Sequence, residues 1–234
     1  MNFLDFDNFI FDFDGTIMDS MNYWVTRPSS YIKYKNKIPK PDLDKQIYFF
    51  ETLETAEFFK IEYGLEGTKE EIHQDMKNWV YSQYKYNSLK KSSVELFKLL
   101  KALNKNLFIL SGSPYELINP AIDHKNIRSY FLDVFSASSN KISKDNGDAI
   151  NYLIKKHNLD KSKTIILDDS PLVLESAKKL GLTVVGIKED YFKSEEEKIK
   201  MISDDYLSLD EIYRKIKEWK LIFTLFLLSA WKLI

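Results

Sequence analysis

Two aspartates, Asp12 and Asp14, stand one residue apart where an apolar run enters a Gly-Thr turn, in the segment NFIFDFDGTIMDS at residues 8–20. Residues 9–13 have the pattern of a buried strand, in which an unpaired carboxylate is costly to bury. Side chains two apart in a strand share one face, so the two carboxylates can begin on the same side. We therefore expect this acidic pair to have a charged partner.

Further polar residues follow two other apolar runs. Ser111 and Gly112 come after LFIL, and Asp168 and Asp169 come after TIIL. If the carboxyl ends of these strands converge, up to four carboxylates share one cleft and repel one another unless a cation is present. Oxygen ligands without His or Cys favour Mg²⁺, which commonly lies beside a phosphate. The sequence thus predicts a site for Mg²⁺ and a phosphorylated small molecule, with an aspartate as the natural nucleophile.

Helical and strand patterns alternate from residue 93 onward. Apolar strand candidates lie at 107–110, 132–135, 164–167 and 183–187, separated by helical patterns. This alternation is typical of an α/β fold with a parallel sheet. Residues 20–92 contain no comparable strand but several helical patterns, and one of them begins with a capping-box pair at Thr68 and Glu71. We interpret residues 20–92 as a small helical module.

Four ordered motifs resemble those of a known family. FDFDGT, ILSGS, SKDNGDAI and IILDDSPLVLESAKKLGL are similar to the motifs of the haloacid dehalogenase (HAD) superfamily of hydrolases, in particular its β-phosphoglucomutase-like phosphatase branch. The resemblance covers residues 8–210. It implies a Rossmann-like parallel sheet core with helices on both faces and an inserted small α-helical cap. We expect the core to comprise residues 1–19 and 93–220, the cap residues 20–92, and a hydrophobic C-terminal tail residues 221–234.

The same resemblance implies which residues carry the chemistry. Asp12 is expected to attack phosphorus and form an aspartyl-phosphate, while Asp14 acts as general acid/base. The resemblance also implies a Mg²⁺ site formed by Asp12, the backbone carbonyl of Asp14, Asp168 and Asp169, the last two binding directly or through water.

The phosphoryl group is expected to have its own set of contacts. By resemblance these are Thr16, Ser111 and a lysine of the third motif, and Gly112 offers a further backbone N–H near a helix start. Lys144 has the family's spacing to the acids that follow it and Lys141 does not, so we favour Lys144 as the catalytic lysine.

The leading interpretation is a Mg²⁺-dependent phosphatase that hydrolyses a small phosphorylated metabolite through an aspartyl-phosphate intermediate. A phosphomutase of the same branch shares every core motif and stays open as an alternative. A non-catalytic binding or scaffold protein on the same fold is the other alternative, and the hydrophobic tail is its main support. A dehalogenase or phosphonate hydrolase is disfavoured because Asp14 is present and those relatives usually lack an acid there.

The amino-acid composition excludes several other classes of function. Lys and Arg number 34 and Asp and Glu number 35, a formal net charge of −1, so no global field recruits nucleic acid or an anionic membrane. The chain has no Cys, which excludes thiol catalysis and disulfides, and Asp5 and Asp7 interrupt any signal-peptide pattern. The apolar part of residues 221–234 is shorter than the roughly 20 residues that span a bilayer. We expect a cytoplasmic monomer or homodimer whose tail packs against the body or a partner rather than a membrane.

Overall fold

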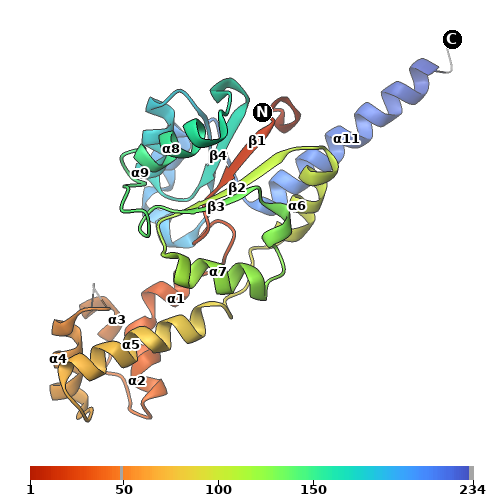
Figure 1. Cartoon of the computed structure of the whole chain (residues 1–234). Coiled ribbons are helices and arrows are strands. Elements are labelled where there is room, and N and C mark those ends of the chain that lie inside the picture. The colour runs from red at the N-terminus through yellow and green to blue at the C-terminus, as the bar shows by residue number, and fades with distance from the viewer. Residues whose placement is uncertain (48–49, 232–234) are drawn as a thin grey trace.

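The computed structural model describes residues 1–47 and 50–231, with the side chains of the last helix described up to Ile222. The described residues form a six-stranded parallel sheet with the order β3-β2-β1-β4-β5-β6 (Figure 1). The strands are β1 (Asn8–Phe11), β2 (Asn106–Ser111), β3 (Asp133–Ser136), β4 (Thr164–Asp168), β5 (Thr183–Ile187) and β6 (Asp205–Leu207). The predicted α/β class with a parallel sheet is confirmed, and β1 lies at the centre of the sheet.

Helices cover both faces of this sheet. They are α6 (Ser93–Ala102), α7 (Tyr115–His124), α8 (Asp148–His157), α9 (Pro171–Lys179), α10 (Glu196–Ile202) and α11 (Leu209–Trp231), with short 3₁₀ turns at Phe3–Asp5, Arg128–Tyr130, Lys161–Lys163 and Asp190–Glu195. Phe9 and Phe11 of β1 belong to the core cluster that contains Phe97 of α6 and Ile212 of α11. Ile10 belongs to the other cluster, formed with α8, α9 and α10. Because successive side chains of β1 fill opposite layers, the strand is held from both sides.

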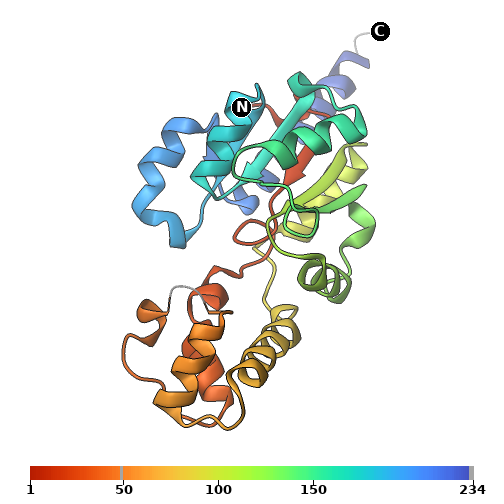
Figure 2. The same ribbon diagram turned by 60° about the vertical axis from the view of Figure 1, so that its left-hand side comes forward.

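The chain leaves β1 and builds a separate group of helices, which we call the cap, before it returns to the sheet (Figure 2). The cap comprises α1 (Met21–Val25), α2 (Arg27–Tyr34), α3 (Leu43–Gln46), α4 (Leu53–Tyr63) and α5 (Lys69–Tyr84). Its centre is aromatic: the rings of Tyr31 and Phe59 stack at 5.8 Å, and Trp79 meets Tyr31 edge-on at 5.6 Å. The capping box at Thr68 and Glu71 is present at the start of α5. Since the cap follows directly from β1, it lies at the carboxyl ends of the strands.

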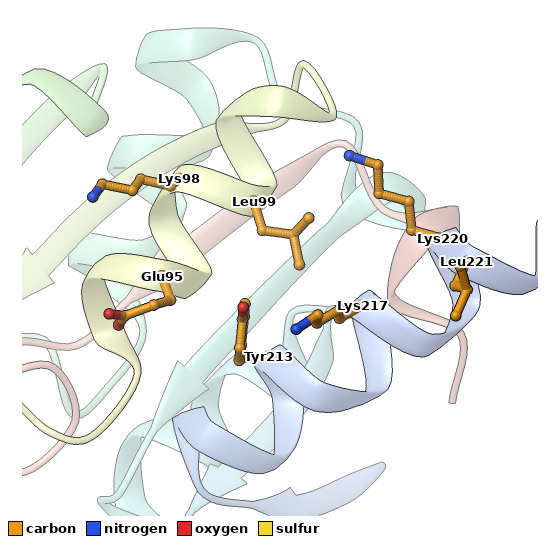
Figure 3. Close-up of a pocket in the computed structure, with 7 residues that line it drawn as sticks. All are labelled: Glu95, Lys98, Leu99, Tyr213, Lys217, Lys220 and Leu221. Atoms are coloured by element: carbon orange, nitrogen blue, oxygen red, sulfur yellow. The ribbon is translucent and has the colours of Figure 1, made fainter. Parts of the chain in front are cut away.

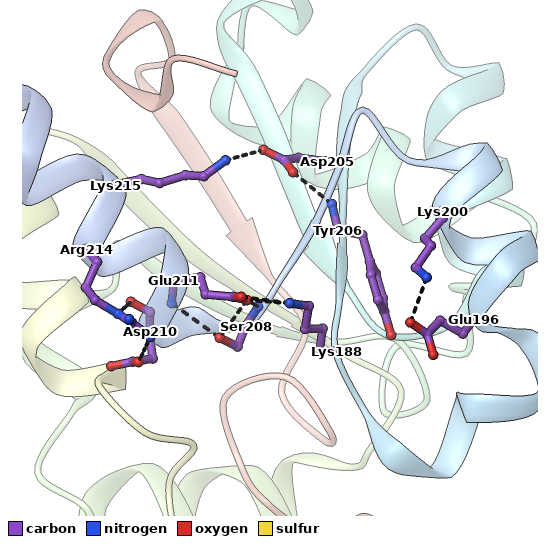
Figure 4. A network of polar contacts seen from close by, with 10 residues as sticks. All are labelled: Lys188, Glu196, Lys200, Asp205, Tyr206, Ser208, Asp210, Glu211, Arg214 and Lys215. Carbon is purple, nitrogen blue, oxygen red and sulfur yellow. Dashed lines mark hydrogen bonds and ion pairs between the residues drawn. The ribbon is translucent and has the colours of Figure 1, made fainter.

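A polar network fixes the start of α11 to the edge of the sheet (Figure 4). Ser208 and Glu211 form a reciprocal pair: the Glu211 N–H donates to Ser208 Oγ at 3.2 Å, and the Ser208 N–H donates to Glu211 Oε2 at 2.7 Å. Lys188, after β5, pairs with Glu211 Oε1 at 2.7 Å, and Lys215 pairs with Asp205 of β6 at 3.1 Å. The reciprocal pair satisfies the N–H of Glu211 in the first turn of the helix, and the two ion pairs tie the start of the helix to the residues of β6 and those after β5.

The second half of α11 extends away from the sheet beyond α6 (Figure 1). Ile212 and Ile216 are buried, whereas Trp219 is 46% exposed and Leu221 60% exposed. Residues 221–231 of the predicted tail continue this helix, and residues 232–234 lie outside the described part. Among the helices of residues 1–47 and 50–231, none combines the length and apolar character needed to cross a bilayer.

Candidate active site

Three buried carboxylates meet at the carboxyl ends of the two central strands. Asp12 lies just past β1, where its backbone N–H still donates to Leu167 O of β4 at 2.9 Å. Asp168 is the last residue of β4, and Asp169 follows it. One oxygen from each of Asp12, Asp168 and Asp169 lies within 4.8 Å of the others. The central pairing of β1 with β4 therefore brings residues from distant motifs into one site.

Lys144 supplies a positive charge to this cluster. It comes from the loop before α8, is buried, and forms ion pairs with Asp12 and, at 2.7 Å, with Asp168 Oδ2. Burial alone would lower the pKa of Lys144, but Asp12 and Asp168 outweigh that effect and hold the pKa above its usual value. Lys141 is exposed. Of the two lysines weighed from the sequence, Lys144 is the one that contacts the carboxylates.

One lysine does not balance three carboxylates. Burial is the main cause that raises the pKa of Asp12, and Asp168 adds to it against the opposing effect of Lys144. Burial, followed by the charge of Asp12, likewise raises the pKa of Asp169 well above its usual value. Asp169 Oδ2 is buried without a hydrogen-bond partner among the described residues. An all-oxygen set with excess negative charge and an unpartnered oxygen fits a hard divalent cation such as Mg²⁺.

Gly15 makes room for Asp169. Its φ of +79° is a conformation that side-chain-bearing residues rarely adopt, and a Cβ built on it would lie 2.1 Å from Asp169 Oδ2. The glycine of the first motif therefore serves two purposes: it turns the chain after Asp14, and it lets the Asp169 carboxylate approach the backbone.

The carboxylate of Asp14 does not belong to this cluster and accepts hydrogen bonds from four neutral donors. Oδ1 accepts from Ser20 Oγ at 2.6 Å, Trp24 Nε1 at 2.8 Å and Tyr84 OH at 2.6 Å. Oδ2 accepts from Ser113 Oγ at 2.6 Å. None of these four donors was predicted from the sequence to belong to the site. Ser113 does lie inside the ILSGS motif, which could have suggested it, whereas Trp24 and Tyr84 have only the pattern of helical core residues.

The predicted phosphate-binding residues lie in two environments. Ser111 ends β2, is buried, and its Oγ accepts from the Ser113 N–H at 3.0 Å. Gly112 is exposed, and a Cβ built on it would meet no atom within 4 Å, so the space beside this backbone is open. Thr16 is buried, and its Oγ1 has no hydrogen-bond partner within the part of the chain that the structure describes. The Thr16 hydroxyl is thus not tied into the carboxylate network.

A pocket of about 300 Å³ lies between cap and core beside Trp24. Trp24, Arg27 and Ile47 line its cap side, and Tyr191 of the core lines the other. The Arg27 guanidinium lies 4.4 Å from the centre of the Trp24 ring and pairs with Glu51 at 2.9 Å. Trp24, which lines this pocket, also donates to Asp14 and so connects the pocket with the acidic site.

A second pocket, of about 560 Å³, lies elsewhere, between α6 and α11 (Figure 3). Leu99, Tyr213 and Leu221 form its apolar lining, with charged side chains around them. None of its lining residues belongs to the carboxylate cluster, so we assign it no part in the chemistry.

The fold and the site define a class of α/β enzyme that carries a helical cap over an acidic site at the carboxyl ends of a parallel sheet. The chain belongs to the haloacid dehalogenase-like hydrolase family, whose model matches residues 9–187. Phosphoglycolate phosphatase from Vibrio vulnificus (strain YJ016) is 25% identical over 108 residues, which are 46% of this chain and 47% of that protein. The aligned part therefore spans about half the length of that relative.

Solved structures share the fold over nearly their whole length. A proposed β-phosphoglucomutase from Thermotoga maritima has a TM-score of 0.74 and 17% identity, covering 91% of this chain and 99% of that one. A proposed HAD hydrolase, YfnB from Bacillus subtilis, described as bound to magnesium, has a TM-score of 0.69 and 16% identity, covering 91% and 99%. At these identities the likeness concerns the fold, and the cap is included in it.

Proposed function

We propose that this protein is a Mg²⁺-dependent phosphatase that hydrolyses a small phosphorylated metabolite through an aspartyl-phosphate on Asp12. The observation that carries the proposal is the arrangement around Asp12, where Lys144, Asp168 and Asp169 converge on one carboxylate. Family membership and the phosphoglycolate phosphatase relative support the same reaction class. The absence of cysteine accords with a reducing compartment, and we propose a cytoplasmic location.

Asp12 and Asp14 divide the reaction between them. An oxygen of Asp12 attacks phosphorus, and the bond from phosphorus to the leaving oxygen breaks as Asp14 gives that oxygen a proton. Asp14 then takes a proton from water, which attacks the aspartyl-phosphate and releases inorganic phosphate and free Asp12. Lys144 holds Asp12 in place and offsets charge on the transferring group.

Asp12, Asp168 and Asp169 would hold the cation, since their oxygens already lie together. When bound, Mg²⁺ supplies positive charge that lets an anionic phosphoryl group approach three carboxylates. Neighbouring residues of the chain hold two of those carboxylates in position: the Ser170 N–H donates to Asp168 Oδ1 at 2.9 Å, and Gly15 leaves space for Asp169.

The pocket beside Trp24 is our proposed place for the organic part of the substrate. Its lining residue Trp24 donates to Asp14, and its volume of about 300 Å³ suits a small molecule. Its lining combines aromatic and aliphatic surface with the paired charge of Arg27.

The test is a phosphate-release screen of the purified protein over sugar phosphates, nucleotides and phosphoglycolate, with Mg²⁺ and with excess chelator. We expect release with Mg²⁺ that chelation removes, and poor substitution by Ca²⁺, whose looser coordination misplaces the nucleophile. The matched control is Asp12→Asn, which keeps the side-chain shape but should lose both turnover and acid-stable phosphoryl label. Full turnover in excess chelator would contradict the metal requirement, and turnover by Asp12→Asn would contradict the nucleophile.

A further inference from the structure

The four hydrogen-bond donors around Asp14 are divided unequally between its two carboxylate oxygens. Three of them, Ser20, Trp24 and Tyr84, share Oδ1, whereas Ser113 alone contacts Oδ2. An oxygen that already accepts three hydrogen bonds has little capacity left for another partner. Oδ2 keeps more, since it accepts from one donor only. Oδ2 is therefore the oxygen that can exchange a proton with a substrate.

Two of the donors on Oδ1 come from the cap, not from the sheet. Trp24 lies in α1, the first cap helix, and Tyr84 is the last residue of α5, directly before the chain returns to the core. Their sequence separations from Asp14 are 10 and 70 residues. Both ends of the cap thus reach back to a single oxygen of the core.

Packing holds these two donors in place. The Tyr84 side chain is fully buried, and its ring centroid lies 5.3 Å from that of Trp24 and 6.5 Å from that of Phe13. Tyr23 closes the cluster with its ring 6.1 Å from Tyr84, but its hydroxyl donates to Val80 O at 3.0 Å and not to Asp14. The tyrosine and the tryptophan therefore offer donors of fixed position, which a solvent-exposed hydroxyl would not.

We propose that Trp24 and Tyr84 are positioning residues for Asp14: they bind Oδ1 and so present Oδ2 to the leaving group. The proposal rests on the proposed function, in which Asp14 is the general acid/base. It adds that the acid is aligned only while the cap is seated on the core, because a shift of the cap withdraws both donors. Protonation of the leaving group is thereby coupled to the position of the cap.

The test compares substrates that need the acid with one that does not. Tyr84→Phe removes a single hydroxyl, Trp24→Phe removes the indole N–H, and Tyr23→Phe is the matched control from the same aromatic cluster. Each variant is assayed for kcat/KM on phosphoglycolate, glycerol phosphate and glucose phosphate, which have poor leaving groups, and on dinitrophenyl phosphate, whose good leaving group needs little protonation. Thermal melting verifies that each variant is folded.

We expect kcat/KM on the three substrates with poor leaving groups, the alkyl phosphates, to fall about tenfold or more in Tyr84→Phe and in Trp24→Phe. This is part of the roughly 10²–10⁴-fold rate increase that general acid catalysis contributes. On dinitrophenyl phosphate the loss should stay below about threefold, and Tyr23→Phe should keep the wild-type ratio between the two substrate classes. This change of ratio separates positioning of the acid from a general structural role, because loss of a structural role would lower kcat/KM on all substrates by the same factor.

Several results would overturn the proposal. An equal loss on both substrate classes, or the same change of ratio in Tyr23→Phe, would assign Tyr84 and Trp24 a structural role only. Wild-type activity on dinitrophenyl phosphate but on none of the alkyl phosphates would mean that no acid acts. If Tyr84→Phe does not fold, Trp24→Phe decides, since the Trp24 side chain is only partly buried. Absence of wild-type activity on every substrate would instead be a failure of the proposed function itself.

Discussion

Removal of Lys144 tests the charge balance of the site most directly. The lysine is buried between Asp12 and Asp168, and the described residues give that pair no second cationic side chain in ion-pair contact. Taking one partner out of a buried ion pair leaves uncompensated charge, which typically costs about 3–5 kcal/mol of folding free energy. The same lysine offsets charge on the transferring phosphoryl group, and loss of one such contact typically costs about 10²–10³ in turnover.

Two variants separate charge from volume. Lys144→Met keeps most of the side-chain volume and removes the charge, whereas Lys144→Ala also leaves a cavity. We expect both to lose about 10²–10³ in kcat and to unfold at lower denaturant concentration, with Lys144→Ala less stable by the additional cavity cost. Lys141→Ala is the control, because Lys141 is exposed and three residues away, and it should keep wild-type turnover and stability.

Metal titration gives an independent measurement of the same effect. Without Lys144 the three carboxylates carry more uncompensated charge, so added Mg²⁺ should stabilise the Lys144→Met protein more than the wild type. The assay is the midpoint of thermal unfolding against Mg²⁺ concentration. Full turnover of Lys144→Ala, or an equal loss in Lys141→Ala, would refute the assignment of the catalytic lysine. An unchanged response to Mg²⁺ would refute the charge argument.

Two further changes probe the turn and the last helix. Gly15→Ala should abolish most activity because its Cβ would lie 2.1 Å from Asp169 Oδ2, whereas Gly64→Ala, at a φ of +60° with nothing within 4 Å, should cost only about 1–2 kcal/mol of backbone strain and no activity. Equal activity losses in the two variants would contradict this steric argument. A chain that ends at Lys220 should stay folded and active, since the last buried side chain among those described in α11 is Ile216, and it should be more soluble or change its association state on a sizing column. Loss of folding on truncation would make residues 221–234 part of the core.

Local patterns predicted the sheet because its strands are short apolar runs bounded by polar turns. The apolar runs that were predicted correspond to β1–β5; β5 has the predicted bounds, and the ends of the other four strands differ by at most two residues. The exception is β6, Asp205–Leu207, which the sequence analysis did not predict. It is three residues long, and two of its side chains are only partly buried, so neither length nor alternation marks it. All three of its residues pair in parallel with the neighbouring strand β5.

The site was predictable where its residues follow strand ends and not where they come from other elements. Asp12 and Asp168 belong to motifs that end adjacent strands, so their meeting follows from the parallel pairing. The donors to Asp14 could not be found in this way. Trp24 and Tyr84 lie in cap helices, and an aromatic residue at helical spacing is usually a core residue. Here Trp24 and Tyr84 are core residues and site residues at once, because their rings pack in the aromatic cluster while one polar atom of each contacts Asp14.

The opening strand delivers two aspartates with different partners, and this difference divides their chemistry. Asp12 lies among charged groups of the core, where Lys144 pairs with it and with Asp168, and Asp169 lies close by, an arrangement suited to meeting a phosphoryl group. Asp14, two residues later, accepts from neutral N–H and O–H donors, two of which, Trp24 and Tyr84, belong to the cap helices. The turn at Gly15 separates the two environments within a few residues of chain. If the positioning proposal holds, the cap governs only the second aspartate, so a variant that loosens the cap should slow protonation of the leaving group before it impairs attack by Asp12.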